Sequence, residues 1–171
     1  MPDALTGLAS HRDLPVHNRE TTSILFDVDS LRWLNAQEGH EVADRALVAI
    51  AESLKRRCEK SPHAKPFRIW GDEFLVLLPS SGPGDAVQFA TELIADVRAQ
   101  NIAYSQPGQP GIDRLAISAV VFDLKDSDAV AISENGPSPA FRDWFETALL
   151  KEKRRRGAVQ GVIVDVRGDL R

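Results

Sequence analysis

Apolar and polar residues follow two different periods along this chain, and each period predicts one kind of element. Runs dense in apolar and β-branched residues are typical of buried strands, and they occur at residues 21–31, 66–70, 73–79, 114–124 and 161–166. Segments with apolar residues every three or four positions are typical of amphipathic helices, and they occupy residues 40–58, 85–100 and 140–156. A further short helix is expected from about Ser30, whose side chain suits the N-cap.

The order of these elements predicts the class of fold. It is strand, helix, hairpin, helix, strand, helix, strand, with the hairpin turn at Gly71-Asp72. A hairpin inside an alternating pattern indicates a mixed or mostly antiparallel sheet with helices packed on it, which is an α+β fold. We expect residues 101–113, which contain Pro and Gly breaks, to form an exposed loop, and residues 125–139 to be irregular.

Length and composition favour a single domain over residues 1–171 of a cytoplasmic protein. A chain of 171 residues is long enough for one substantial core. The formal net charge of −4 argues against a protein that coats nucleic acid. No stretch approaches the roughly 20 apolar residues of a membrane helix. The N-terminus lacks the pattern of a signal peptide. Cys58 is the only cysteine, so no internal disulfide can form, which fits a reducing compartment.

Acidic residues lie where two of the predicted strands end or turn. Asp27 and Asp29 end the first strand on the same face, and Asp72 and Glu73 lie at the hairpin turn. Any one of these acids, taken alone, is more often a solvated cap or turn former. If the strands are neighbours, however, the carboxylates meet at one edge of the sheet, where their mutual repulsion favours a bound cation. Oxygen ligands of this kind suit Mg²⁺, which serves phosphoryl chemistry.

Three ordered groups of residues resemble the GGDEF domain of diguanylate cyclases. They are Asp3–Leu8 (DALTGL), Asp27–Asn35 with Gly39–Asp44 (DVDSLRWLN and GHEVAD), and Arg68–Phe74 (RIWGDEF), and their spacing also fits. The later stretches LAISAVVF and FETALLKEKRRRG resemble the closing strand and last helix of that family more weakly. The resemblance implies a palm-like, nucleotide-cyclase-type mixed sheet of five strands flanked by helices. It also implies condensation of two GTP molecules to cyclic di-GMP, with release of two pyrophosphates.

The resemblance assigns the metal and the chemistry to particular residues. It implies that Asp27, the Val28 carbonyl and Asp72 bind the metal, Mg²⁺ or Mn²⁺. It implies that Asp72 and Glu73 are the catalytic residues. In that family two domains form a head-to-head homodimer, in which each ribose 3′-hydroxyl attacks the α-phosphate of the other GTP. The implied partners are therefore GTP, a second copy of the chain and a protein that supplies regulation, with no nucleic acid and no membrane.

The resemblance also assigns the recognition of GTP. It implies that Asn35 and Asp44 bind guanine. A carboxylate suits this role because guanine offers N1–H and N2–H₂ as hydrogen-bond donors. The phosphates need positive partners and free backbone N–H groups at a helix start. The residues that complete the substrate-binding set are Ser30, Leu31, Arg32, Gly71 and Lys153. For Lys153, which lies in the basic run KEKRRR, a solvated basic face is an equally good interpretation.

The chain departs from the family pattern at the signature and at the last helix. Trp70 replaces the first signature glycine, where it would either stack on a base or ribose or block the half-site. Gly157 stands where the family has a phosphate-binding arginine, and residues 61–66 (SPHAKP) replace the inhibitory Arg-x-x-Asp motif. These departures leave two alternatives to a diguanylate cyclase open. One is a catalytically impaired module that binds GTP or a cyclic dinucleotide for signalling, and the other is a cyclase with a different cyclic-dinucleotide product.

Overall fold

The computed structural model describes residues 1–15, 20–79, 82, 84–104, 113–158 and 160–167. Within them one mixed sheet has the strand order β1-β3-β4-β2-β7-β8, and a separate pair joins β5 to β6. The strands are β1 (Ala9–Ser10), β2 (Thr21–Asp29), β3 (Lys65–Trp70), β4 (Glu73–Leu77), β5 (Ala103–Tyr104), β6 (Asp113–Arg114), β7 (Ala116–Leu124) and β8 (Ile163–Asp165). The helices are the short 3₁₀ helix η1 (His11–Asp13), α1 (Leu31–Glu38), α2 (His40–Glu59), α3 (Asp85–Ala99), α4 (Asp126–Asn135) and α5 (Pro139–Arg156).

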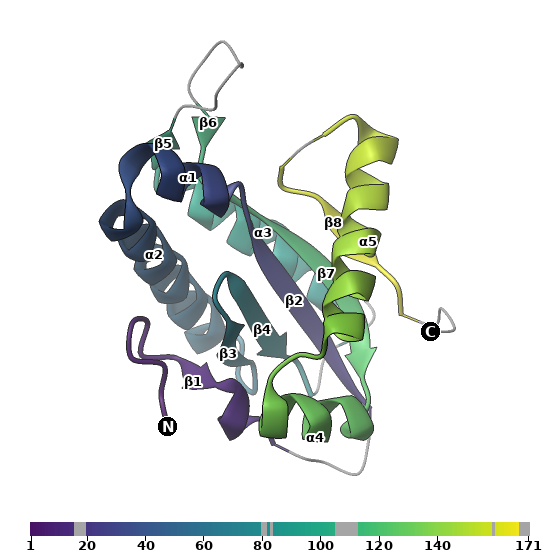
Figure 1. Ribbon diagram of the computed structural model, residues 1–171. Helices are drawn as coiled ribbons and strands as arrows, with labels where there is room; N and C mark the ends of the chain where they lie inside the picture. Colours follow the sequence, from purple (N-terminus) through teal and green to yellow (C-terminus); the bar gives the residue numbers. More distant parts are fainter. Residues whose placement is uncertain (16–19, 80–81, 83, 105–112, 159, 168–171) are drawn as a thin grey trace.

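The sheet lies between two layers of helices, which explains the continuous apolar run of its central strand. Along β2, Ile24 and Phe26 pack into the core formed with α1, α2 and α3. Leu25 points to the opposite face and packs into the core formed with α4 and α5. Figure 1 shows α5 in front of the sheet and α3 behind it. A strand that is buried on both faces needs apolar residues at successive positions rather than alternate ones.

The pairing of the strands confirms the predicted mixed, helix-flanked fold. Strand β2 is antiparallel to both β4 and β7, β3 and β4 form the predicted hairpin, and β8 is parallel to β7. The sheet has six strands rather than the five expected, because the two-residue strand β1 pairs in parallel with β3. A strand of two residues is too short to show a period of its own.

Two loop predictions need correction. The segment 125–139 is not irregular, because α4 occupies Asp126–Asn135. Only Ala129 and Ile132 of α4 are buried, so its apolar period is weak and its polar residues dominate the sequence pattern. The predicted loop at 101–113 begins and ends in the paired strands β5 and β6, and residues 105–112 lie outside the described part of the chain.

The short helix predicted from about Ser30 is α1, and Ser30 holds its N-cap position. The cap is not the one predicted, however, because the Ser30 side chain makes no capping hydrogen bond and its backbone is left-handed, with φ at 64°. This conformation is uncommon for a residue other than glycine. It allows the chain to turn sharply from β2 into α1. Among the described helices, none is long and apolar enough to cross a membrane.

Candidate active site

The acids at the end of β2 and at the hairpin turn meet at one edge of the sheet. In the antiparallel pairing of β2 with β4, Asp27 lies directly opposite Glu73. The Val28 N–H donates a hydrogen bond to the Asp72 carbonyl at 3.3 Å, which joins the end of β2 to the turn. The strands that carry the predicted metal and catalytic residues are therefore neighbours. We call Asp27, Asp72 and Glu73 the carboxylate edge.

The electrostatics of the carboxylate edge favour a cation. Burial, together with the negative charges of Asp72 and Asp29, raises the pKa of Asp27 to about 8. A positive ion would remove this penalty. In the part of the chain that the structure describes, no group of three or more His, Cys, Asp or Glu side chains is arranged to hold a metal. Two carboxylates, Asp27 and Asp72, with the Val28 carbonyl nevertheless fit Mg²⁺, which binds through few protein ligands and keeps waters or substrate phosphates.

Glu73 is buried, with only 3% of its surface exposed. The Arg142 Nε donates to Glu73 Oε1 at 3.3 Å, whereas Glu73 Oε2 has no hydrogen-bond partner among the described residues. Burial raises the pKa of the Glu73 carboxyl, and the nearby Arg142 charge opposes this effect. A buried carboxylate oxygen without a partner is costly. Glu73 Oε2 is therefore available for a proton or for a hydroxyl donor.

Asp29 faces the same side of the sheet but has a different environment. Its carboxylate is fully buried and accepts hydrogen bonds from Ser118 Oγ at 2.8 and 2.9 Å, from Lys153 Nζ at 2.6 Å and from the Gly161 N–H at 2.8 Å. The Ser118 Oγ in turn accepts from the Val162 N–H at 3.2 Å. These contacts join β2, β7, α5 and the segment that precedes β8. We call Asp29, Ser118, Lys153 and Gly161 the Asp29 cluster.

Lys153 therefore bonds to a carboxylate rather than standing free. Its side chain is 20% exposed, and one of its three ammonium hydrogens is needed for Asp29. In this structure the positive charge of Lys153 therefore neutralises the negative charge of the buried Asp29 carboxylate. A solvated basic face, the alternative interpretation of its sequence context, does not describe Lys153, although it describes the exposed Arg154–Arg156.

The predicted substrate-binding residues lie on the helix pair that follows β2. Asn35 belongs to α1, and its Oδ1 is buried without a hydrogen-bond partner among the described residues. Asp44 is exposed in the first half of α2. Leu31 is buried at the start of α1, where the first N–H groups have no partner within the helix, and Arg32 is exposed. A buried amide oxygen without a partner is costly, so a rotation of the Asn35 side chain that gives this oxygen a donor would be favourable.

Trp70 does not strain the hairpin, and its ring lies toward α4 and α5. Its φ is not positive, so the side chain causes no strain at the position where the family has glycine. The ring is 48% exposed, and the Arg142 guanidinium lies 5.4 Å from its centroid. The other neighbour is Gly136, where a β-carbon would lie 3.5 Å from the ring. Trp70 thus leans toward the junction of α4 and α5. Its neighbour Gly71 is exposed at the turn, and Gly157 ends α5 as its C-cap.

Several residues that hold this site were not found from the sequence. Arg142 contacts Glu73, Ser118 contacts Asp29, and Arg68 donates from Nε and Nη2 to the Gly71 carbonyl at 3.0 and 2.6 Å. An arginine in a polar helix start and a serine inside a strand carry no local signal of such roles. Arg68 had a weak signal, because it lies within the segment that resembles the family signature.

Comparison with known families agrees with this geometry. The family model described as diguanylate cyclase, GGDEF domain, matches residues 2–134. The chain belongs to the GGDEF family. Its relatives include the probable diguanylate cyclase DgcJ of Escherichia coli K12, which is 27% identical over 139 residues. That match covers 75% of this chain but 26% of DgcJ, so this GGDEF domain spans about a quarter of that relative. An uncharacterised 19.3 kDa protein of Streptomyces ambofaciens is 27% identical over 146 residues, which cover 80% of this chain and 79% of that protein.

Solved structures share the fold of this GGDEF domain. The GGDEF domain of DgcB from Caulobacter crescentus, in complex with c-di-GMP, superposes with a TM-score of 0.65 at 16% identity, covering 96% of this chain and 92% of that one. Diguanylate cyclase SiaD from Pseudomonas aeruginosa, in complex with its activator SiaC, gives a TM-score of 0.66 at 23% identity, covering 96% of this chain and 61% of that one. At these identities the likeness concerns the fold.

Proposed function

We propose that this GGDEF domain is a diguanylate cyclase, which condenses two GTP molecules to cyclic di-GMP in a head-to-head homodimer of domains 1–171. The observation that carries the proposal is the carboxylate edge. Asp27 and Glu73 face each other across neighbouring strands, and the pKa of Asp27 is raised to about 8 by burial and by the acids around it. Such an arrangement is unfavourable unless a cation and a phosphate use it.

The residues of the carboxylate edge divide the chemistry between them. Asp27, the Val28 carbonyl and Asp72 would hold the metal, which would neutralise charge on the α-phosphate and on the 3′-oxygen as it loses its proton. Asp72, together with Glu73, accepts the proton of a ribose 3′-hydroxyl. The 3′-oxygen then bonds to the α-phosphorus of the other GTP, and pyrophosphate leaves. The same step from the facing domain closes the ring.

Binding and orientation of GTP fall to α1, α2 and α5. Asn35 and Asp44 recognise guanine, and this requires the Asn35 amide, whose Oδ1 is buried in the structure, to turn toward the base. The phosphates accept hydrogen bonds from the N–H groups of Ser30 and Leu31. Arg32, Gly71 and Lys153 complete the phosphate-binding set. For Lys153 this means that the ammonium hydrogens not used by Asp29 turn to the phosphates. A protein partner is proposed to regulate the dimer, by analogy with the SiaD structure, which contains an activator.

The first experiment incubates the purified domain at high concentration with GTP and Mn²⁺ or Mg²⁺ and identifies the products by mass spectrometry. We expect cyclic di-GMP. Asp72→Ala and Asp72→Asn should lower its formation at least about a hundredfold, because the turn loses a metal ligand and proton acceptor. Arg155→Met, which changes an exposed ion pair on α5, is the control and should keep full activity.

The second candidate function is a module that binds GTP or a cyclic dinucleotide without turnover, and the exposed Trp70 and the missing arginine at Gly157 favour it. Unchanged GTP in the same incubation, with binding demonstrated by calorimetry, would favour this second function. Full activity in both Asp72 variants would exclude the proposed mechanism. A cyclic dinucleotide other than cyclic di-GMP would exclude the assignment of Asn35 and Asp44 to guanine.

A further inference from the structure

Trp70 makes contacts that a signature glycine could not make. Its ring lies against Gly136, which ends α4, and under the guanidinium of Arg142, which belongs to the first turns of α5. A guanidinium within about 6 Å of a tryptophan centroid is attracted by the electrons of the ring, and the distance here is 5.4 Å. The tryptophan therefore connects the hairpin turn to the helix that crosses the sheet.

Arg142 makes a second contact, to a residue of the carboxylate edge. Its Nε donates to Glu73 Oε1 at 3.3 Å, while the central carbon of the guanidinium lies 5.4 Å from the Trp70 ring centroid. The Arg142 side chain is 36% exposed, but the Glu73 side chain is only 4% exposed. The planar guanidinium has a fixed direction for its donors, so holding its plane also fixes the direction of the Nε–H.

Glu73 needs this support because the rest of its environment gives it none. Its Oε2 has no partner among the described residues, and Asp72 and Glu146 add negative charge nearby. A carboxylate with one bonded and one open oxygen is orientated only by the bonded one. If Arg142 turned away, the Glu73 carboxylate would lose the hydrogen bond that sets the direction of its Oε1.

From these contacts we propose that Arg142 is a positioning residue for Glu73 and that Trp70 is the platform that holds Arg142. We call Trp70, Arg142 and Glu73 the signature clamp. The tryptophan is thus a working part of this signature rather than a block to the half-site. The inference deepens the proposed function, since it concerns a residue to which that function gives a catalytic role.

Two variants remove the signature clamp, and two others serve as comparisons. Arg142→Met keeps the length of the side chain but loses the hydrogen bond, and Trp70→Gly restores the family residue but loses the platform. Trp70→Phe keeps an aromatic platform. Arg155→Met removes an exposed arginine from the same helix, away from the clamp.

The first readout is amide hydrogen exchange, which needs no turnover. We expect peptides over residues 68–75 to exchange at least about threefold faster in Arg142→Met and Trp70→Gly than in the wild type. Peptides over β7 should exchange at the wild-type rate, which separates loss of the clamp from loss of the fold. Trp70→Phe and Arg155→Met should match the wild type in both regions. Equal exchange at residues 68–75 in all variants would overturn the proposal.

The second readout is the split between kcat and KM for GTP. A positioning role predicts a kcat about tenfold or more lower in Arg142→Met and Trp70→Gly, with KM changed by less than about twofold. Trp70→Phe should retain most of the activity. A higher kcat in Trp70→Gly would show that the tryptophan blocks the site, and a rise in KM alone would make Arg142 a phosphate ligand; either result overturns the proposal. If the wild type lacks turnover, the proposed function fails, while the exchange experiment still decides about the clamp.

Discussion

At the scale of single residues, a chain of hydrogen bonds and an ion pair connects the N-terminal segment to the hairpin turn. Asp3 Oδ1 accepts from the Thr6 N–H and hydroxyl, at 2.8 and 2.6 Å, and from Arg68 Nη1 at 2.9 Å. Arg68 then donates to the Gly71 carbonyl in the turn. Burial raises the pKa of Asp3, but the hydrogen bonds from Thr6 and Arg68 outweigh it and leave that pKa below its ordinary value of 3.8.

The lowered pKa of Asp3 predicts how stability depends on pH. The charged form is favoured in the folded protein, so this contribution is present above the unfolded pKa and is lost as pH falls through the folded pKa. We expect Asp3→Asn to lower the free energy of unfolding by roughly 1–3 kcal/mol at neutral pH. The difference from the wild type should shrink as the pH falls below the ordinary pKa of 3.8. Urea unfolding at several pH values measures this, and a difference that does not change with pH would contradict the assignment.

Residues were predictable from the sequence where a motif or a strand end marked them. The approach of Asp27 to the signature turn followed from a strand end, a hairpin and the family spacing. The contact between Lys153 and Asp29 did not, because it depends on how α5 crosses β2, 124 positions away along the chain. Arg142 was missed for the same reason. Its function comes from a neighbour in space and from no local pattern.

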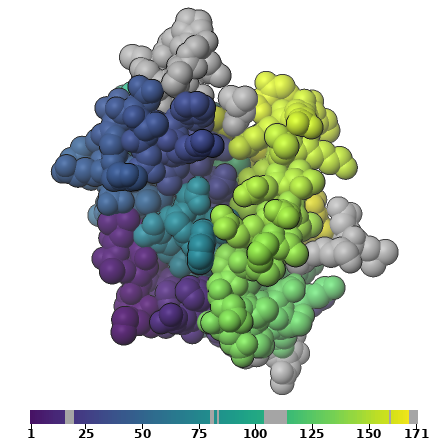
Figure 2. All heavy atoms as spheres, in the orientation of Figure 1, coloured from purple at the N-terminus to yellow at the C-terminus, as the bar shows by residue number. Residues whose placement is uncertain are grey.

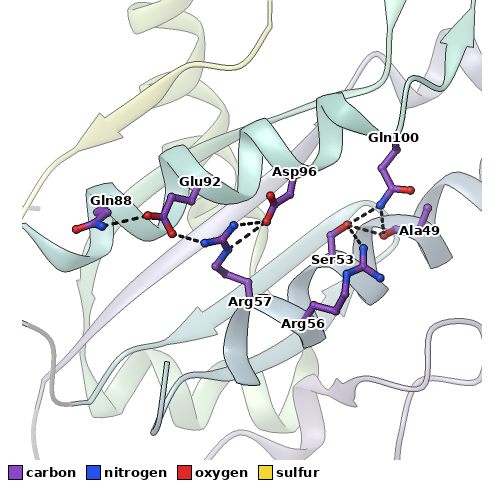
Figure 3. Close-up of polar contacts among 8 residues, drawn as sticks. All are labelled: Ala49, Ser53, Arg56, Arg57, Gln88, Glu92, Asp96 and Gln100. Carbon is purple, nitrogen blue, oxygen red and sulfur yellow. Dashed lines mark hydrogen bonds and ion pairs between the residues drawn. The ribbon is translucent and has the colours of Figure 1, made fainter. Parts of the chain in front are cut away.

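At the scale of elements, α2 and α3 are joined by a polar network in addition to their apolar contact. Arg57 of α2 pairs with Glu92 and Asp96 of α3, and its Nε donates to Asp96 Oδ2 at 3.1 Å (Figure 3). Near the end of α3, Gln100 donates to Ser53 Oγ at 2.7 Å. Both helices also cover the same face of the sheet. The network joins the second half of α2 to α3 and so helps to fix how the two helices lie relative to each other.

Two arginines of α2 offer a matched test of this network. Arg57 has a side chain that is 15% exposed, whereas Arg45 is 68% exposed in an ion pair with Glu41 of the same helix. We expect Arg57→Met to lower the free energy of unfolding by roughly 1–2 kcal/mol, because two acids that are 41% and 42% exposed lose their partner. Arg45→Met should change it by less than about 0.5 kcal/mol. Chemical denaturation of both variants measures the contrast, and equal effects would mean that the network contributes little.

The elements themselves were predictable in proportion to the strength of their period. Helices α2 and α3 bury clear apolar faces, and α5 packs Phe145 and Leu149 with the partly buried Phe141, Trp144 and Ala148, so all three appear where the sequence placed them. Helix α4 does not, since it buries few residues and begins with acidic residues that also favour turns. Acidic side chains in the first turn stabilise a helix through its dipole. The sequence pattern therefore contained the signal for α4, but in its charges rather than in its apolar residues.

At the scale of the whole molecule, the carboxylate edge belongs to one half of the proposed reaction centre. Figure 1 shows the turn between β3 and β4 in the space between α2 and α5. Figure 2 shows the same face, with α1 and α2 in blue on one side and α5 in green and yellow on the other. The proposed chemistry needs two GTP molecules, and one chain supplies one carboxylate edge. A single copy is therefore not sufficient for turnover.

This requirement predicts how the rate depends on protein concentration. Where dimers are rare, the rate of cyclic di-GMP formation should rise with about the square of the protein concentration. Fusing the domain to a dimeric coiled coil should make the rate linear in protein concentration. The fusion should also raise the rate at low protein concentration. Initial rates over a hundredfold dilution series measure the order. A linear dependence without the fusion, in a protein that remains monomeric in analytical ultracentrifugation, would contradict the two-domain mechanism.

The Asp29 cluster has a consequence for where this chain can be cut. The family match ends at residue 134, yet the buried carboxylate of Asp29 takes hydrogen bonds from Lys153 and Gly161, which lie beyond it. Phe145 and Leu149, also beyond it, complete the core on that face. A fragment trimmed to the family boundary would keep the Ser118 hydrogen bond to Asp29 but lose the Lys153 charge and the Gly161 N–H, and it would expose an apolar surface. The boundary of the recognisable family is thus not the boundary of the smallest piece that folds.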